Sequence, residues 1–99
     1  MAKKKVLKKV VIRTYSAGVF VAELVSRKGK EAVLDNCRRV YSWSGASSLS
    51  QLAMEGVKNP DSCKISMATN GHEVTEVIEV IPMTKAGWDN IQAVKVWKN

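Results

Sequence analysis

The sequence predicts an α+β fold, with a mostly antiparallel sheet of about five to six strands and two short helices in a single domain. Short β-branched runs recur along the chain, and Gly, Asn and Pro turn signals separate them. Two other segments carry apolar residues at helical spacing behind a capping residue. A length of 99 residues suits one domain with a small core, which assembly into a homo-oligomer would stabilise.

The first half of the chain predicts three strands in an antiparallel meander. Residues 6–15 contain a β-branched run, and residues 19–27 follow after the turn at Ser16-Ala17-Gly18. Lys28-Gly29 closes a hairpin into a third extended segment over residues 31–43. Because segments that are neighbours in sequence usually pair, we expect these strands to lie side by side.

Asp35 and Asn36 interrupt the third segment. They indicate either a bulge in one long strand or a break into two short strands. In the stretch that follows, side chains of an extended chain alternate between two faces. One face would then carry Arg39, Tyr41 and Trp43, and the other Arg38, Val40 and Ser42.

A short helix is predicted over residues 47–55. Ser48 and Gln51 have the spacing of a capping box, and Gly56 stands where a helix-terminating glycine is common. Its apolar stripe at helical spacing consists of Leu49, Leu52 and Ala53.

Two further strands are predicted after this helix. Residues 62–68 alternate, and their apolar side is formed by Cys63, Ile65 and Met67. Asn70-Gly71 is a turn signal that leads into residues 74–81, and Pro82 ends this run. The apolar spacing of residues 74–81 also fits a helix, but β-branching and the preceding turn favour a strand.

The last part of the chain predicts a second helix and an edge strand. Thr84 can cap a helix over residues 85–93, in which Trp88 and Ile91 would cover the sheet and Gly87 weakens the helix. Residues 94–98 alternate again and predict an edge strand with Trp97 on one side. Trp97 would then either form a subunit contact or pack within the monomer.

Composition argues against membrane, disulfide and metal-bound classes. No apolar run approaches the roughly 18 residues of a membrane span, and the N-terminus lacks the apolar core of a signal peptide, so we expect a cytoplasmic protein without a membrane partner. Cys37, Cys63 and His72 do not form a zinc ligand set, and we expect both thiols to be buried or idle. We expect no metal and no cofactor.

Catalytic constellations are missing from the sequence. Glu73, Glu76 and Glu79 do not make an acid/base pair, because in a strand Glu76 points opposite to the other two and in a helix all three form a solvated face. Ser44-Gly45 lacks the flanking glycines of a nucleophile elbow, and there is no Gly-rich phosphate loop. We therefore expect a protein that is not an enzyme.

Most of the net positive charge comes from the N-terminal segment. The formal net charge is +7, and most of it comes from five lysines, Lys3, Lys4, Lys5, Lys8 and Lys9. Residues 1–5 are accordingly predicted to be a basic tail preceding a single domain over residues 6–99. Such a tail is a solvated end, which we favour, or an arm that contacts nucleic-acid phosphates together with Arg13, Arg38 and Arg39.

The junction between the third strand and the first helix is the candidate ligand site. The first turn of a helix attracts anions, and arginine can grip phosphate while an aromatic ring stacks on a base. The alternative is structural, with aromatic residues in the core and serines that only cap. The predicted ligand-binding residues are Arg38, Arg39, Tyr41, Trp43, Ser44, Gly45, Ser47 and Ser48.

Three segments resemble a family of short phage and prophage proteins of uncharacterised function. They are residues 13–24 (RTYSAGVFVAEL), residues 35–64 and residues 75–84 (TEVIEVIPMT), and the second contains the W-S-G-A-x-S-L-S-Q-L-A motif at residues 43–53. At Ser42 the chain departs from the family pattern, which has another aromatic residue there. The family brings no catalytic residues to transfer.

This resemblance implies a viral accessory protein in the cytoplasm of a bacterial host. Such proteins often antagonise host defence, either by binding a host protein or by sequestering a nucleotide immune signal. Our leading hypothesis is a non-enzymatic, homo-oligomeric binder of a nucleotide-like small molecule. The alternatives are a nucleic-acid-binding accessory protein that uses the basic arm, and a module that docks on a host protein.

Overall fold

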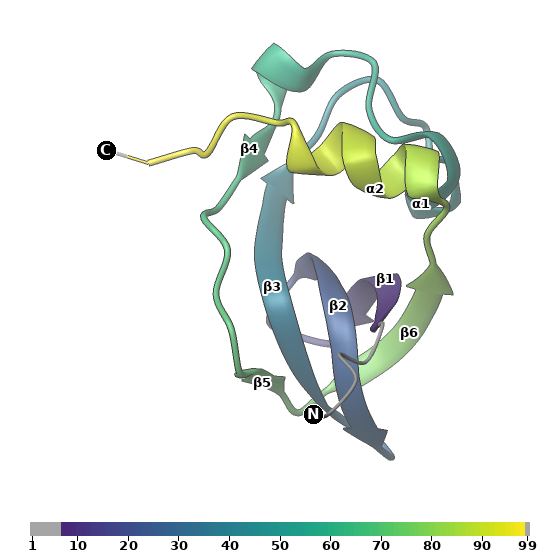
Figure 1. The fold of residues 1–99 in the computed structure, drawn as a ribbon, viewed down its shortest axis with the longest axis vertical. Helices are drawn as coiled ribbons and strands as arrows, with labels where there is room; N and C mark the ends of the chain where they lie inside the picture. Colours follow the sequence, from purple (N-terminus) through teal and green to yellow (C-terminus); the bar gives the residue numbers. More distant parts are fainter. Residues whose placement is uncertain (1–6, 99) are drawn as a thin grey trace, which may run out of the picture.

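The first three strands form the predicted antiparallel meander. In the computed structural model, which describes residues 7–98, β1 (Lys8–Thr14), β2 (Val19–Lys28) and β3 (Glu31–Ser42) pair in succession (Figure 1). Gly18 has a φ of 96°, and its carbonyl accepts hydrogen bonds from both the backbone N–H and the side-chain hydroxyl of Thr14. The predicted turn between the first two strands is therefore confirmed.

The interruption in the third segment is a bulge, not a break. Arg38 pairs with Val21 and Asp35 pairs with Glu23, so two residues of β3 lie opposite Ala22 alone. Asn36 has a φ of 49°, a left-handed conformation that asparagine tolerates better than most residues. β3 consequently continues as one bent strand.

The chain from residue 64 to residue 74 follows β3 rather than forming a hairpin of its own. β4 (Lys64–Ile65) pairs with the end of β3, Thr69 bridges to Cys37, and β5 (His72–Val74) pairs with the beginning of β3. The predicted strand over residues 62–68 is wrong in its length, and Met67 is exposed instead of facing a core.

Asn70-Gly71 does not reverse the chain, because it forms a kink that matches the bulge in β3. The Asn36 N–H donates to Asn70 Oδ1 over 2.8 Å, and the Gly71 N–H donates to Asp35 Oδ1 over 2.9 Å. Gly71 has a φ of 65°. The two kinks satisfy each other's backbone groups, so both chains bend together.

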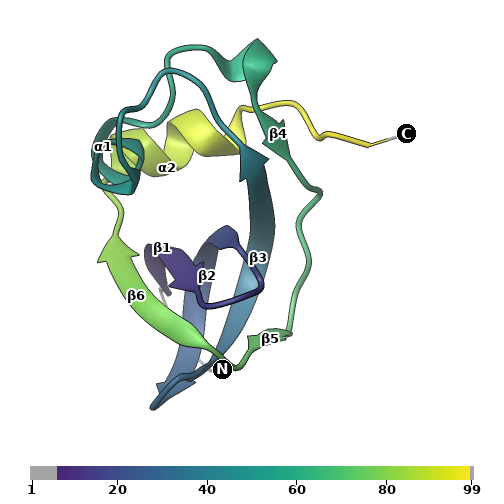
Figure 2. The same ribbon diagram turned by 180° about the vertical axis from the view of Figure 1, so that it is seen from behind.

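The strand alternative for residues 74–81 is confirmed, although the strand is interrupted. After β5 the chain turns at Thr75 and Glu76 and enters β6 (Val77–Pro82), which pairs with the far side of β1. Five strands of the six-stranded sheet have the order β4-β3-β2-β1-β6. The sixth strand, β5, lies outside this order and pairs with β3. The sheet is strongly curled (Figure 2).

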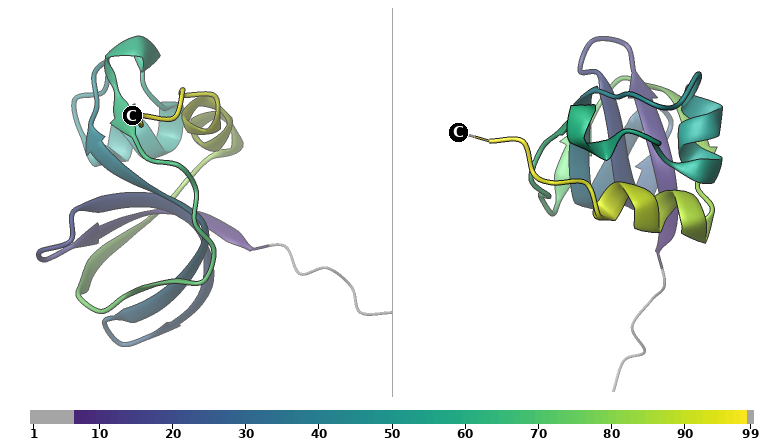
Figure 3. Two further views of the ribbon diagram at one scale, coloured as in Figure 1. Left: turned by 90° about the vertical axis from the view of Figure 1, so that its left-hand side faces the viewer. Right: turned by 90° about the horizontal axis from the view of Figure 1, so that it is seen from above.

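Both faces of the sheet are covered by apolar clusters. On one face, Val11, Val21 and Val40 pack beneath the helices with Leu52 and Ile91. The sheet curls around the other cluster, which contains Ile12, Phe20, Leu34, Cys37 and Val77 (Figure 3). The α+β class with two short helices is thus confirmed.

The first helix, α1 (Leu49–Glu55), is capped nearly as predicted. Ser48 Oγ accepts from the Gln51 N–H over 3.1 Å, and Gly56 ends the helix with its N–H on the Leu52 carbonyl. Gln51 Oε1 accepts from the Ser47 N–H rather than from Ser48. The helix still has both ends satisfied.

The second helix, α2 (Lys85–Gln92), packs across α1. Thr84 caps it by accepting from the Gly87 N–H over 3.0 Å, and Trp88 and Ile91 are buried as predicted. A Cβ added to Gly87 would lie only 2.2 Å from the Ala53 carbonyl oxygen. Gly87 is therefore what lets the two helices approach, so the expectation that it only weakens the helix misses its packing role.

The C-terminal segment lies along β4. Val96 forms a single parallel bridge with Ile65, and the Trp97 N–H donates to the Ile65 carbonyl over 2.9 Å. The predicted edge strand over residues 94–98 is thus reduced to one bridge. A short 3-10 turn, η1 (Pro60–Ser62), precedes β4. Among the described residues, no helix has the length and apolar character that crossing a bilayer requires.

Candidate functional site

Arg38 is buried inside the protein, with a relative exposure of 4%. Its guanidinium donates to the backbone carbonyls of Ser66 at 2.8 Å, Ile91 at 2.9 Å and Val94 at 3.0 Å. Burial lowers the pKa of this guanidinium. Arg38 therefore ties β3 to the segment after β4 and to the end of α2, and its donors are occupied.

The alternation of β3 could have indicated this role. Arg38 shares its strand face with Val40, which is buried in the cluster beneath the helices. A charged residue on a buried face needs partners inside the protein. Here the backbone carbonyls of Ile91, at the end of α2, and of Val94, just beyond it, accept from its guanidinium.

Trp43 does not join Arg39 and Tyr41 on one face. β3 ends at Ser42, so the alternation stops before Trp43. Trp43 is half-buried and packs against the cluster beneath the helices, whereas Arg39 lies over Phe20, which belongs to the other cluster. The predicted convergence of these three side chains is absent.

The loop between β3 and α1 is bonded to its own protein. The Ser44 carbonyl accepts from the Asn59 N–H, and the Gly45 carbonyl accepts from the Lys58 N–H. A Cβ on Gly45 would lie 2.4 Å from the Lys58 nitrogen. Gln51 engages the Ser47 N–H and the Ser48 hydroxyl. These groups at the helix start serve capping and loop closure.

Arg39 instead begins a row of cations and aromatic rings. Its guanidinium carbon lies 4.8 Å from the Phe20 ring centroid and 5.9 Å from the Tyr41 ring centroid. Its Nε is buried without a hydrogen-bond partner in the described structure. The guanidinium is thus held by aromatic faces rather than by a carboxylate.

The row continues from Tyr41 to the C-terminal segment. The rings of Tyr41 and Trp97 are 5.2 Å apart and tilted by 59°, and Lys64 Nζ lies 5.5 Å from the Trp97 ring centroid. Tyr41 is 52% exposed and Trp97 is 49% exposed. We call Arg39, Tyr41, Trp97 and Lys64 the cation–aromatic row.

The sequence predicts half of this row as a ligand site. Arg39 and Tyr41 are predicted site residues, and Trp97 is expected to be either a subunit contact or packed within the monomer. Lys64 carries no signal in sequence, since only the pairing of β4 with β3 and the bridge to Val96 bring it to Trp97.

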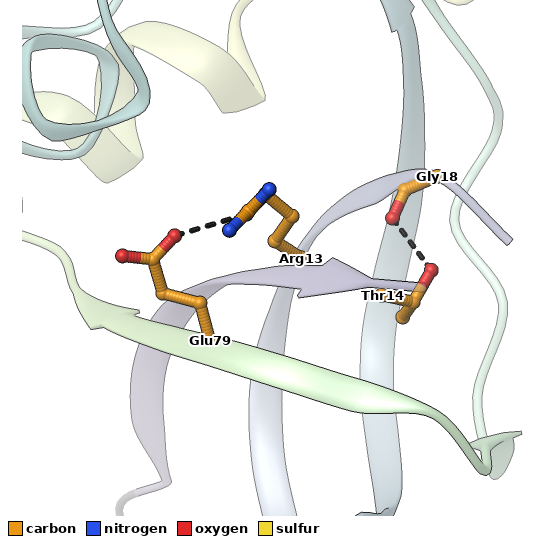
Figure 4. Close-up of polar contacts among 4 residues, drawn as sticks. All are labelled: Arg13, Thr14, Gly18 and Glu79. Carbon is orange, nitrogen blue, oxygen red and sulfur yellow. Dashed lines mark hydrogen bonds and ion pairs between the residues drawn. The ribbon is translucent and has the colours of Figure 1, made fainter. Parts of the chain in front are cut away.

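Three cations of the described sheet and helices have acidic partners, whereas Lys8, Arg27 and Lys28 have none. Arg13 Nε is 3.1 Å from Glu79 Oε1 across the β1–β6 pair (Figure 4). Lys9 pairs with Glu23, and Lys85 pairs with Asp89. Between residues 7 and 98, neither Arg39 nor Lys64 forms an ion pair with a side-chain carboxylate.

The described members of the basic arm, Lys8, Lys9, Arg13, Arg38 and Arg39, differ in their surroundings. Lys3, Lys4 and Lys5, and the tail over residues 1–5, lie outside the described residues. Lys8 is exposed at the start of β1, while Lys9 also lies 5.5 Å from the Trp88 ring centroid. With Arg13 bound to Glu79 and Arg38 buried, the described members of this group do not form one surface.

A surface cavity adjoins the row at Trp97. It has a volume of about 420 Å³ and is lined by Pro60, Asp61, Cys63, Lys95, Val96, Trp97 and Lys98. Two lysines and one aspartate therefore line this cavity, and Trp97 both lines it and packs against Tyr41.

The described cysteines and histidine are placed in packing roles. Burial raises the pKa of the Cys37 thiol to about 12, while the positive charge of Arg39 acts weakly in the opposite direction. His72 packs its ring 5.2 Å from that of Phe20. Within residues 7–98, no group of three or more His, Cys, Asp or Glu side chains is placed to hold a metal ion.

Most of the chain matches a known protein family. A family model described as "Domain of unknown function (DUF6948)" matches residues 7–91. The matched span includes Arg39, Tyr41 and Lys64, while Trp97 lies beyond it. No curated protein and no solved structure matches the chain.

Proposed function

The chain belongs to the DUF6948 family, and from its cation–aromatic row we propose that it is a non-enzymatic protein that binds a phosphorylated ligand with a flat ring, such as a nucleotide. The proposal rests on the surroundings of the Arg39 and Lys64 side chains. Both rest on aromatic rings and have no carboxylate partner in the described chain. Arg39 Nε is buried, so in this proposal the anion is bound by the terminal N–H groups of Arg39 and by the Lys64 ammonium.

The chemistry of the row suits both parts of a nucleotide. A guanidinium can donate two parallel hydrogen bonds to phosphate, and an ammonium supplies a further point charge. Tyr41 and Trp97 have about half of their surface exposed, which leaves area for a base to stack. Arg39 keeps the role predicted for it, whereas Arg38 and Trp43 stabilise the fold.

The resemblance to phage proteins suggests the setting. In this proposal the protein acts in the cytoplasm of a bacterial host and sequesters a nucleotide signal against host defence. Assembly into a homo-oligomer would present several rows at once and raise the capacity for ligand. The row itself requires only one chain.

Calorimetric titration with a panel of linear and cyclic nucleotides tests the proposal. We expect at least one nucleotide to bind, and Arg39→Ala to lower its affinity about tenfold or more, since a charged hydrogen bond contributes about 1.5–3 kcal/mol. Arg13→Ala is the matched control, because Arg13 is a sheet arginine already paired with Glu79.

Arg39 also packs on Phe20, so the fold of the variant has to be verified. Tyr41→Ala provides a second variant on the exposed side of the row and should weaken binding while leaving the unfolding midpoint nearly unchanged. Absence of binding to every nucleotide in the panel, or equal losses for Arg39→Ala and Arg13→Ala, would refute the proposed function.

A further inference from the structure

We infer that the ligand of the cation–aromatic row is a single-stranded nucleic acid that continues past Trp97 into the neighbouring cavity. This inference rests on the proposed function and specifies its ligand class. It rests on two exposed rings, those of Tyr41 and Trp97, that lie close to several cationic groups. These groups belong to Arg39, Lys64, Lys95 and Lys98.

Trp97 belongs to two candidate binding regions. One contains Tyr41, at 5.2 Å between ring centroids, and then Arg39. The other is the cavity of about 420 Å³, where Lys95 and Lys98 join Trp97 in the lining. A ligand that stacks a base on each ring and also contacts the cavity contains more than one nucleotide.

The charges of the two regions favour a phosphate backbone. Arg39 and Lys64 flank the rings, and Lys95 and Lys98 flank the cavity, against one carboxylate at Asp61. Proteins that bind single strands combine cations along the backbone path with aromatic rings on which successive bases stack. This arrangement matches that combination.

The exposure of the rings favours a ligand that extends beyond one nucleotide. Small-molecule sites usually enclose most of the ligand between apolar walls and a few converging polar groups. Here Tyr41 and Trp97 lie on the surface with about half of each side chain exposed. Such a surface gains affinity by engaging several nucleotides in succession.

Fluorescence anisotropy with labelled oligouridylate and oligothymidylate of about 10 nucleotides tests the inference, since a single-strand site takes roughly 4–16 nucleotides. Unlabelled UMP serves as competitor. We expect both oligomers to bind about tenfold or more tighter than UMP, because each stacked base adds affinity. RNA and DNA should bind alike, since stacking and phosphate contacts do not read the 2′-hydroxyl.

Substitutions separate the two regions. Trp97→Ala should lower oligomer affinity roughly tenfold. The double variant Lys95→Ala/Lys98→Ala should weaken the oligomers while leaving UMP binding nearly unchanged. Lys64→Ala should reduce the salt slope of oligomer binding by roughly 0.7, the value for one phosphate contact on a single strand. Lys85→Ala is the control, because Lys85 pairs with Asp89 on α2.

The contribution of the basic tail to oligomer binding has to be distinguished from that of the cation–aromatic row. The triple variant Lys3→Ala/Lys4→Ala/Lys5→Ala should retain the Trp97 dependence of oligomer binding. If that variant abolishes oligomer binding and Trp97→Ala leaves it unchanged, the inference is wrong.

Equal affinities for UMP and the oligomers would overturn the inference and leave the proposed function standing. Failure of UMP, the oligomers and the nucleotide panel to bind at all would remove both.

Discussion

Arg38 and Arg39 are adjacent in sequence and have opposite roles. Alternation along β3 turns Arg38 toward the end of α2, where backbone carbonyls accept its donors, and turns Arg39 over Phe20 on the other face. Sequence alone treats the two arginines as equivalent phosphate ligands. Only the burial of Val40, which shares a face with Arg38, distinguishes them.

Replacing Arg38 should destabilise the protein strongly. Arg38→Met removes the donor from the Val94 and Ser66 carbonyls, and we expect a loss of about 3 kcal/mol in the free energy of unfolding. Arg38→Lys should also lose about 2 kcal/mol, because an ammonium cannot span the same carbonyls. Urea denaturation measures both.

The exposed Arg27 provides the control for Arg38, since its Nε reaches only the Gly29 carbonyl. Arg27→Met should change the free energy of unfolding by less than about 0.5 kcal/mol. A value for Arg38→Met close to that of Arg27→Met would show that the carbonyl contacts contribute little.

Cys37 should be an inert thiol in the native protein. Its pKa is raised from 9.0 to about 12 by burial, so the folded state favours the protonated form. The stability from this preference is complete below about pH 9 and is lost as the pH rises toward 12. Native protein treated with iodoacetamide at about pH 8 should remain unmodified at Cys37 by mass spectrometry, whereas urea-unfolded protein reacts. Rapid native alkylation of Cys37 would contradict the assignment.

At the scale of elements, local sequence rules predicted the helices well. Ser48, Thr84 and Gly56 occupy the cap positions that their residue types favour. The kinks at Asp35-Asn36 and Asn70-Gly71 were harder to predict, because Asn70-Gly71 considered alone has the sequence of a hairpin turn. It becomes a bend matched to Asp35-Asn36 through bonds between segments far apart in sequence.

Gly87 gives a test at the helix–helix contact. Alanine usually stabilises an exposed helix position by about 1 kcal/mol relative to glycine. Gly87→Ala should instead destabilise the protein by about 1–3 kcal/mol, because its Cβ would lie 2.2 Å from the Ala53 carbonyl oxygen.

The neighbouring exposed Ala86 is the matched control. Ala86→Gly should lose about 1 kcal/mol, so the preference between alanine and glycine should reverse between adjacent positions. Thermal unfolding of both variants measures this reversal. A gain in stability for Gly87→Ala would show that α1 and α2 do not pack as described.

At the scale of the whole molecule, the sequence was sufficient for the α+β class and the initial meander. It did not indicate that β5 pairs with β3 while β6 crosses to β1, since that path depends on how the sheet curls around Phe20 and Leu34. The candidate site also differs from the predicted one because it depends on the path of the chain around the sheet. Arg39 and Tyr41 meet Trp97 and Lys64 only after β4 and the C-terminal segment dock beside β3.

The most direct test of the cation–aromatic row is an NMR titration that follows the indole N–H signals of the three tryptophans as UMP is added. Trp97 lies in the row, while Trp43 and Trp88 pack against the cluster beneath the helices. We predict that the Trp97 signal shifts with added nucleotide and that the other two remain in place. A shift of Trp43 without a shift of Trp97 would contradict the account and return the site to the junction before α1.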